Sequence, residues 1–118
     1  MLNNNFDWYC QLFIDAPLET DSLRNLITNI TNGKPVAGSF VENEFLQINV
    51  RKNHDWDEYK KNDPGNGFLF YKFFLDITPK GKNINFKDYI QQIKLLMKDV
   101  QAEGFKTVPA CDYEDQLI

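Results

Sequence analysis

Cysteine and histidine are scarce in this chain, which has two cysteines and one histidine among 118 residues. Zinc and redox motifs use closely spaced cysteines, and small disulfide scaffolds need several, whereas Cys10 and Cys111 stand at opposite ends of the sequence. A catalytic zinc site generally takes three protein ligands, and His54 has no second imidazole to accompany it. We therefore expect neither a metal nor a cofactor, and we interpret the two cysteines as buried thiols.

Long apolar runs and a basic charge balance are also missing. No segment approaches the ~18 apolar residues of a membrane span, and the first ten residues lack the basic start and apolar core of a secretory signal. We expect a cytoplasmic protein without a membrane partner. Seventeen acidic against thirteen basic residues give a net charge of -4, so direct binding to nucleic acid, which needs a basic face, is not expected.

Nucleophilic and phosphate-binding motifs are absent as well. The six glycines are scattered and match no phosphate-binding loop, and there is no Gly-x-Ser-x-Gly turn. A cysteine nucleophile would need a base, which only His54 could supply as an imidazole. We therefore predict a protein that is not an enzyme. One enzymatic alternative stays open, acid–base chemistry by Asp112, Glu114 or His54, because the sequence alone does not exclude a cleft around them.

What the chain does contain is enough apolar surface for a single α+β domain over residues 1–118, since 42% of its residues are hydrophobic. Residues 6–14 alternate with period two and predict a strand with one buried face. That face holds Phe6, Trp8, Cys10, Leu12 and Ile14. Thr20 or Asp21 is expected to cap a short amphipathic helix that runs to Gly33, the residue best suited to a left-handed helix end.

The middle of the chain is rich in strand signals. Residues 36–53 predict either one long strand or a hairpin that turns at Glu42 and Asn43. Residues 54–66 carry charges and the turn sequence Asp-Pro-Gly-Asn, and they form the longest expected loop. Residues 67–79 then predict the strongest strand, which its five aromatic side chains mark as central.

The last third of the chain predicts a long helix followed by a short strand. Asn85, with Asp88 three residues later, resembles a capping arrangement, and an apolar helical stripe continues to Gly104. Residues 107–118 hold the final strand, in which Pro109 indicates an edge position.

This order of elements predicts a two-layer α+β sandwich, with an antiparallel sheet and both helices on one face. A ferredoxin-like βαββαβ arrangement is our first expectation. It places the first and last strands side by side and brings Cys10 near Cys111, so a disulfide is geometrically open if the environment oxidises.

The face of the sheet away from the helices is expected to be rich in aromatic side chains. It would carry Tyr9, Phe13, Phe68, Phe70 and Phe74. A monomer seldom leaves so much aromatic surface in water, so this face is expected to meet a partner, a second copy in a homodimer, or the long loop.

Two short stretches combine an aromatic side chain with flanking acids, a common pattern at protein interfaces. Trp56 stands between Asp55 and Asp57, and Tyr113 stands between carboxylates near the end of the chain. The predicted partner-binding residues are Trp56, Asp57, Glu58, Asp112, Tyr113, Glu114 and Asp115. The structural alternatives are that Trp56 fastens its own loop and that Tyr113 is half-buried in the last strand.

The tail ACDYEDQL, residues 110–117, together with the aromatic stretch 68–75, resembles a signature of a poorly characterised family of small bacterial proteins. More broadly, a small acidic α/β domain without catalytic motifs is similar to the immunity proteins of bacterial contact-dependent and polymorphic toxin systems. That resemblance implies a toxin inhibitor, which binds a toxin domain, often a basic nuclease, and blocks its active site. We therefore expect a protein-binding domain; the alternative is a small-molecule-binding or regulatory module that uses the aromatic sheet face.

Overall fold

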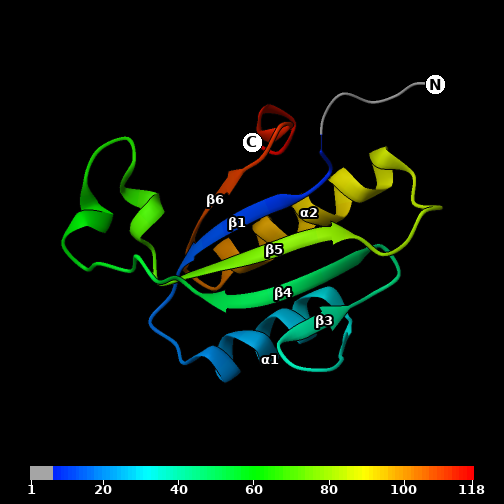
Figure 1. Ribbon diagram of the computed structural model, residues 1–118, viewed down its shortest axis with the longest axis horizontal. Helices are drawn as coiled ribbons and strands as arrows, with labels where there is room; N and C mark the ends of the chain where they lie inside the picture. The colour runs from blue at the N-terminus through cyan, green and yellow to red at the C-terminus, as the bar shows by residue number, and fades with distance from the viewer. Residues whose placement is uncertain (1–6) are drawn as a thin grey trace.

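The computed structural model describes residues 7–118, which form one antiparallel sheet with two helices packed on one of its faces (Figure 1). The strands are β1 (Cys10–Asp15), β2 (Lys34–Pro35), β3 (Phe40–Glu42), β4 (Leu46–Lys52), β5 (Phe73–Pro79) and β6 (Lys106–Ala110). The helices are α1 (Thr20–Thr31) and α2 (Phe86–Ala102), and three short 3₁₀ turns are η1 (Lys60–Asn62), η2 (Gly67–Phe70) and η3 (Glu114–Gln116). The expected α+β class, with an antiparallel sheet and two helices, is confirmed.

The number of strands differs from the expected βαββαβ order. The sheet has six strands in the order β2-β3-β4-β5-β1-β6, because β2 and β3 precede β4 after the first helix. Residues 36–53 form a hairpin of β3 and β4, not one long strand. The side-chain oxygen of Asn43 holds its turn by accepting hydrogen bonds from the backbone N–H groups of Phe45 and Leu46, both at 2.8 Å.

The core lies between the sheet and the helices and follows the period-two pattern of the strands. From β1 it takes Cys10, Leu12 and Ile14, all fully buried, and Phe6 of the expected strand lies outside the described residues. The neighbouring strands add Leu46, Ile48, Val50, Phe73, Leu75 and Ile77, and the helices add Leu23, Ile27, Tyr89, Ile93, Leu96 and Val100. Burial of each large apolar side chain contributes about 1.5–3 kcal/mol relative to its exposure, so this layer is the main stabilising element.

The expected strand over residues 67–79 is wrong in its first part. Residues Gly67–Phe70 form the 3₁₀ turn η2, and β5 begins only at Phe73. The chain passes so close to η1 that a Cβ on Gly67 would lie 2.4 Å from the carbonyl oxygen of Lys61. Glycine is therefore needed at residue 67, and the aromatic residues after it belong to a folded loop instead of the sheet.

The first helix begins and ends differently from the sequence expectation. Its N-cap is Glu19, which makes no side-chain capping bond, so neither Thr20 nor Asp21 is the cap. Its left-handed end is Asn32, with φ of 53°, and not Gly33. Asparagine tolerates this conformation. Gly33 is required for another reason, because a Cβ there would lie 2.6 Å from the carbonyl oxygen of Glu42.

The second helix starts at the expected cap. The side-chain oxygen of Asn85 accepts hydrogen bonds from the backbone N–H groups of Lys87 at 2.8 Å and Asp88 at 3.4 Å. The helix then buries one stripe against the sheet and exposes the opposite one. Within residues 7–118, neither this helix nor α1 is long and apolar enough to cross a membrane.

Replacing Asn85 with alanine should lower the free energy of unfolding by about 1 kcal/mol, because two N–H groups at the start of α2 lose their acceptor. Urea unfolding followed by far-UV circular dichroism measures the change. Asn83→Ala is the matched control, since Asn83 is exposed and precedes the helix. Equal stabilities of the two variants would show that the cap contributes nothing.

Candidate functional site

Exposed large hydrophobic side chains concentrate on the segment that joins β4 to β5, residues 53–72, here termed the β4–β5 loop. Three of the six such side chains on residues 7–118 belong to it: Trp56 at 38% exposure, Tyr59 at 90% and Leu69 at 41%. Single exposed apolar residues are ordinary, whereas a group of them on one projecting segment makes that segment the candidate contact surface. The loop stands out from the end of the sheet at the left of Figure 1.

The base of this loop is closed by Asn53, the buried polar residue among the described core. Its backbone N–H donates to the carbonyl of Lys72 at 2.8 Å. Its side-chain amide donates to the carbonyls of Leu69 and Tyr71, both at 2.8 Å, and its side-chain oxygen accepts from the N–H of Asp55 at 3.0 Å. One side chain therefore joins the two ends of the loop, as in compact Ω-loops.

Asp57 fixes the next turn. Its backbone N–H donates to the carbonyl of Phe70 at 3.1 Å, across the loop. One carboxylate oxygen accepts from the N–H groups of Tyr59 at 2.9 Å and Lys60 at 3.0 Å, which holds the pKa of Asp57 below its ordinary value. Asp57 thus shapes the loop, and one of its two carboxylate oxygens is already engaged in doing so.

Lys61 ties the loop to the sheet. Its ammonium group lies 3.2 Å from the carboxylate of Asp15, at the end of β1, and 3.1 Å from that of Glu58. The hydrogen bonds that Lys61 donates to Glu58 and to Asp15 raise the pKa of Lys61, although partial burial opposes the shift. This cation joins one acid of the sheet to one acid of the loop.

Trp56 is held in place while part of its ring stays exposed. Its indole N–H donates to the carboxylate of Glu58 at 2.6 Å. The ammonium groups of Lys72 and Lys52 lie 4.9 Å and 5.3 Å from its ring centroid, within the range of cation–π attraction. The expectation that Trp56 fastens its own loop and the expectation that it is available to a partner are therefore compatible.

The loop also covers one end of the open sheet face. The ring of Phe68 meets that of Phe13 edge to face at 5.3 Å, and Phe74 lies 5.7 Å from Phe13 on the same face. Phe13 is consequently only 5% exposed. Part of the expected aromatic surplus is thus covered by the long loop, one of the three expected occupants.

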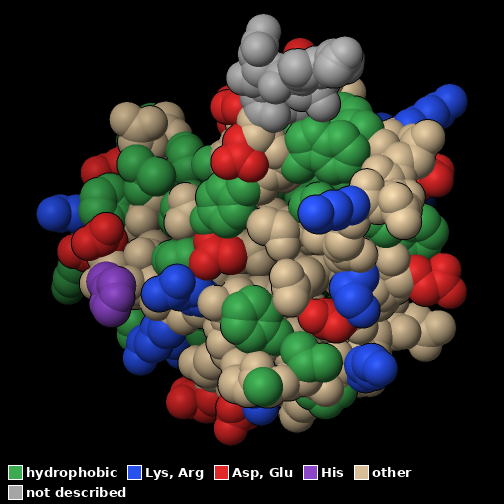
Figure 2. All heavy atoms as spheres, turned by 45° about the vertical axis from the view of Figure 1, so that its right-hand side comes forward, with side chains coloured by type: hydrophobic (Ala, Val, Ile, Leu, Met, Phe, Trp, Pro, Cys, Tyr) green, Lys and Arg blue, Asp and Glu red, His purple; other side chains and the backbone are tan. Residues whose placement is uncertain are grey.

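A cleft of about 440 Å³ remains between this loop and the open face. It is lined by Gln11, Phe13, Asn53, His54, Asp55, Leu69, Phe70 and Phe74. The guanidinium of Arg51 lies 5.7 Å from the ring centroid of Phe74, next to the cleft. On the face that Figure 2 shows, charged side chains of both signs are interspersed with apolar ones, and His54 is seen in purple at the left.

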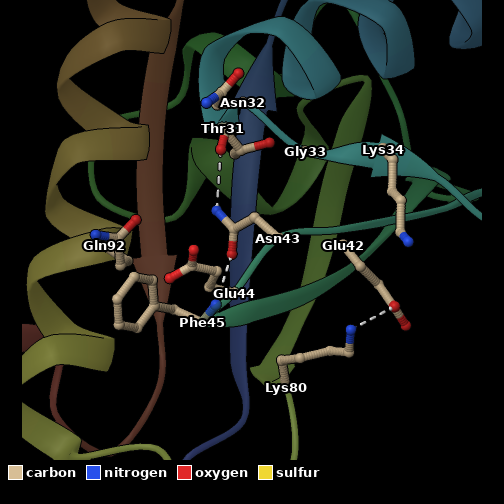
Figure 3. A pocket seen from close by; sticks show the side chains of 10 residues that line it. All are labelled: Thr31, Asn32, Gly33, Lys34, Glu42, Asn43, Glu44, Phe45, Lys80 and Gln92. Carbon is tan, nitrogen blue, oxygen red and sulfur yellow. Dashed lines mark hydrogen bonds and ion pairs between the residues drawn. The ribbon is translucent and has the colours of Figure 1, made fainter.

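A larger pocket, of about 520 Å³, lies at the other side of the molecule, between the end of α1, the β3–β4 turn and α2 (Figure 3). Its polar groups bond mainly to one another. Lys80 pairs with Glu42 at 3.0 Å and lowers the pKa of that carboxyl, while the amide of Asn43 donates to the carbonyl of Thr31 at 3.1 Å. These internal bonds show that the polar groups of the pocket join the β3–β4 hairpin to the end of α1.

The prediction that Tyr113 is a surface anchor for a partner is wrong. Its side chain is 1% exposed, its hydroxyl donates to the carbonyl of Trp8, and it lies 3.3 Å from the hydroxyl of Tyr89. Burial raises the pKa of Tyr113, so the phenol stays neutral. The residue closes the core beneath the tail and leaves no surface for a partner.

The predicted acidic neighbours of Tyr113 are exposed but lie far from Trp56. Asp112, Glu114 and Asp115 follow β6, beside the start of β1, and Asp112 accepts from the N–H of Asp7 at 3.0 Å. Trp56 lies with Asp57 and Glu58 in the loop that Lys61 ties to the other end of β1. The structure therefore separates the two predicted groups by the length of that strand.

The groups proposed for acid–base chemistry are separated in the same way. His54 lines the cleft beside the β4–β5 loop, whereas Asp112 and Glu114 lie beyond the opposite end of β1. In the described part of the chain, no three His, Cys, Asp or Glu side chains are grouped in a way that could hold a metal ion.

Two exposed residues of the loop are not among the partner-binding residues that the sequence predicts. Tyr59 lies within the charged run DEYKKND, and a lone aromatic residue among charges is the signal that could have found it. Leu69 falls within the central strand predicted over residues 67–79. Its exposure follows only from the 3₁₀ turn that replaces the start of that strand.

Comparison of the chain with known protein families, with curated proteins and with solved structures finds no match.

The indole N–H of Trp56 should report the titration of Glu58. The hydrogen bond from Trp56, and then that from Lys61, hold the pKa of Glu58 below its ordinary value of 4.5. A lowered folded pKa means that this contact stabilises the loop above pH 4.5 and is lost as the pH falls through the folded value. We expect the indole resonance in ¹⁵N–¹H spectra to shift with a midpoint below 4.5.

Glu58→Gln is the matched control, because it keeps an acceptor for the indole and removes the titrating group. Its Trp56 resonance should not move over the same pH range. A midpoint at or above the ordinary value in the unmodified protein would contradict the hydrogen bond.

Proposed function

We propose that this chain is a non-enzymatic protein-binding domain whose main contact surface is the β4–β5 loop. The observation that carries the proposal is the combination of exposed Trp56, Tyr59 and Leu69 with a loop that its own hydrogen bonds hold in one conformation. The same segment offers anchors for a partner and a fixed support for them.

Rigid support matters because ordering a loop on binding costs free energy. In the β4–β5 loop the bonds of Asn53, Asp57 and Lys61 are already made, so a partner would meet a preformed surface. Tryptophan and tyrosine are also the residues most enriched among those that dominate binding energy, and a charged rim commonly surrounds them. Trp56 and Tyr59, with the adjacent acids and lysines, fit that description.

The specific version of this proposal is an immunity protein that binds and neutralises a cognate bacterial toxin domain in the cytoplasm. It is supported by the resemblance to small acidic immunity proteins and by the net charge of -4. The exposed Asp112, Glu114 and Asp115 would accelerate association with a basic toxin by long-range attraction. The loop itself carries four acidic and three basic residues, so its contacts would match a partner of mixed charge.

A second candidate function, a small-molecule-binding or regulatory module, is favoured by the cleft of about 440 Å³ beside the loop. Apolar lining with a few polar groups is typical of ligand pockets, and here Phe13, Phe70 and Phe74 accompany His54 and Asp55. A thermal-shift screen tests it, because a ligand that binds only the folded state raises Tm. Phe74→Ala should abolish any shift obtained; a shift that persists would place the ligand elsewhere.

We also infer a ferredoxin-like arrangement for the four longer strands and two helices, with β2 and β3 as an addition at one edge. The neighbour order β4-β5-β1-β6, antiparallel throughout, supports this inference. The inference adds no function, since one fold serves many functions.

The test of the proposed function is co-expression with the toxin domain encoded by the neighbouring gene. We expect the unmodified chain to restore growth and to bind the purified domain. Trp56→Ala and Tyr59→Ala should each weaken binding by about 2 kcal/mol or more, roughly 30-fold in Kd, measured by calorimetry.

Leu95→Ala is the matched control, because Leu95 is 43% exposed on α2, away from the loop. It should bind like the unmodified chain. Toxicity that persists in the presence of the unmodified chain would remove the immunity assignment for that pair, and binding that tolerates both loop substitutions would remove the loop as the contact surface.

A further inference from the structure

The two cysteines lie at one end of a pair of neighbouring strands, because Cys10 begins β1 and Cys111 directly follows the end of β6. β1 and β6 are antiparallel, with Gln11 opposite Ala110 and Leu12 opposite Pro109. Continuing this register by one residue past the end of β6 places Cys10 opposite Cys111. Residues in such positions have Cα atoms about 4.5–5.5 Å apart, which falls within the range of about 4.4–6.8 Å found for disulfides.

Their side chains also pack against the same core. Cys10 shares the helix-facing side of β1 with Leu12 and Ile14, and Cys111 packs against the same core. The two thiols are close enough to affect each other, since interaction with Cys111 adds to burial in raising the pKa of Cys10. Both cysteines are free thiols in this structure, so the pair is present in its reduced form.

The two thiols differ in access. Cys10 is fully buried, whereas Cys111 lies at the rim of the sheet and is partly exposed. Burial raises the pKa of both groups, but at Cys111 hydrogen bonds from the N–H of Tyr113 and from Cys10 oppose the shift. An external reagent should therefore react first at Cys111, and Cys10 is placed to complete the exchange.

We propose that Cys10 and Cys111 form a reversible thiol–disulfide modification site, whose oxidant is a small-molecule disulfide. The deprotonated sulfur of Cys111 attacks one sulfur of the reagent, forms a mixed disulfide and releases one equivalent of reagent thiol. Cys10 then loses its proton and attacks the sulfur of Cys111, which releases the second thiol. Two protein thiols are oxidised to one disulfide, and one reagent disulfide is reduced to two thiols.

The product would fasten an edge strand. β6 pairs only with β1 within the described sheet, and the bond would close a loop of about 100 residues between them. The site lies beside the tail, at the opposite end of β1 from the β4–β5 loop. It is therefore separate from the β4–β5 loop, the proposed main contact surface, and lies beside the exposed acids Asp112 and Glu114.

The test treats the reduced full-length chain with excess glutathione disulfide at mildly alkaline pH and follows the reaction by acid quenching and mass spectrometry. We expect a transient glutathione adduct, then a product that has lost two hydrogens and yields a Cys10–Cys111 peptide on non-reducing digestion. Its Tm should exceed that of the reduced chain by roughly 10 °C, and dithiothreitol should reverse the change.

Two variants separate the steps. Cys10→Ala should stop at the glutathione adduct on Cys111, and Cys111→Ala should remain unmodified under the same conditions, because its remaining thiol is buried. The proposal would be overturned if the unmodified chain stopped at the adduct, formed only intermolecular disulfides, or reacted first at Cys10. A Tm below that of the reduced chain would overturn the fastening role of the bond.

Discussion

The arrangement of this molecule depends on the pairing of β1 with a strand on each side. Its helix-facing residues form the centre of the core, and its backbone bonds to both β5 and β6. One end of β1 carries Asp15, which holds the β4–β5 loop through Lys61. The other end lies beside the tail and the two cysteines. The length of β1 therefore sets the distance between the Trp56 segment and the Tyr113 segment, the two places where the sequence has an aromatic residue among acids.

The tail shows why the neighbours of a residue in the sequence are a poor guide to whether its side chain is exposed. Tyr113 stands among exposed acids, yet its hydroxyl reaches the carbonyl of Trp8 and its ring meets Phe86 edge to face at 5.5 Å. A tyrosine can satisfy its hydroxyl inside a core, so flanking charges do not decide its exposure. The β4–β5 loop is the opposite case, because Trp56, Tyr59 and Leu69 stay outside while a small amide, Asn53, occupies the interior.

Local patterns predicted the elements that depend on local forces. The alternation of Leu12 and Ile14 identified the buried face of β1, and Asn85 identified the start of α2. The patterns failed where long-range contact decides the outcome. Residues 67–70 have strand-like composition, but Gly67 must pass the backbone of Lys61, and Tyr113 is drawn into a core built by distant residues. At the candidate site, Trp56 was found by its flanking acids, whereas Tyr59 and Leu69 required knowledge of how the loop folds back.

Because Asn53 closes the loop, the conformation of the loop and the identity of its exposed side chains can vary independently. In many proteins these two properties are coupled. The bonds of Asn53 are made almost entirely to backbone carbonyls and N–H groups, which every residue type supplies. The exposed side chains of Tyr59 and Leu69 therefore have no part in these bonds, and Trp56 adds only the cation–π contacts of its ring with Lys52 and Lys72 at the base of the loop. Substitutions at Trp56, Tyr59 and Leu69 can change what the surface contacts while the sheet beneath keeps its register. A chain built in this way can therefore acquire a new partner without a change of fold.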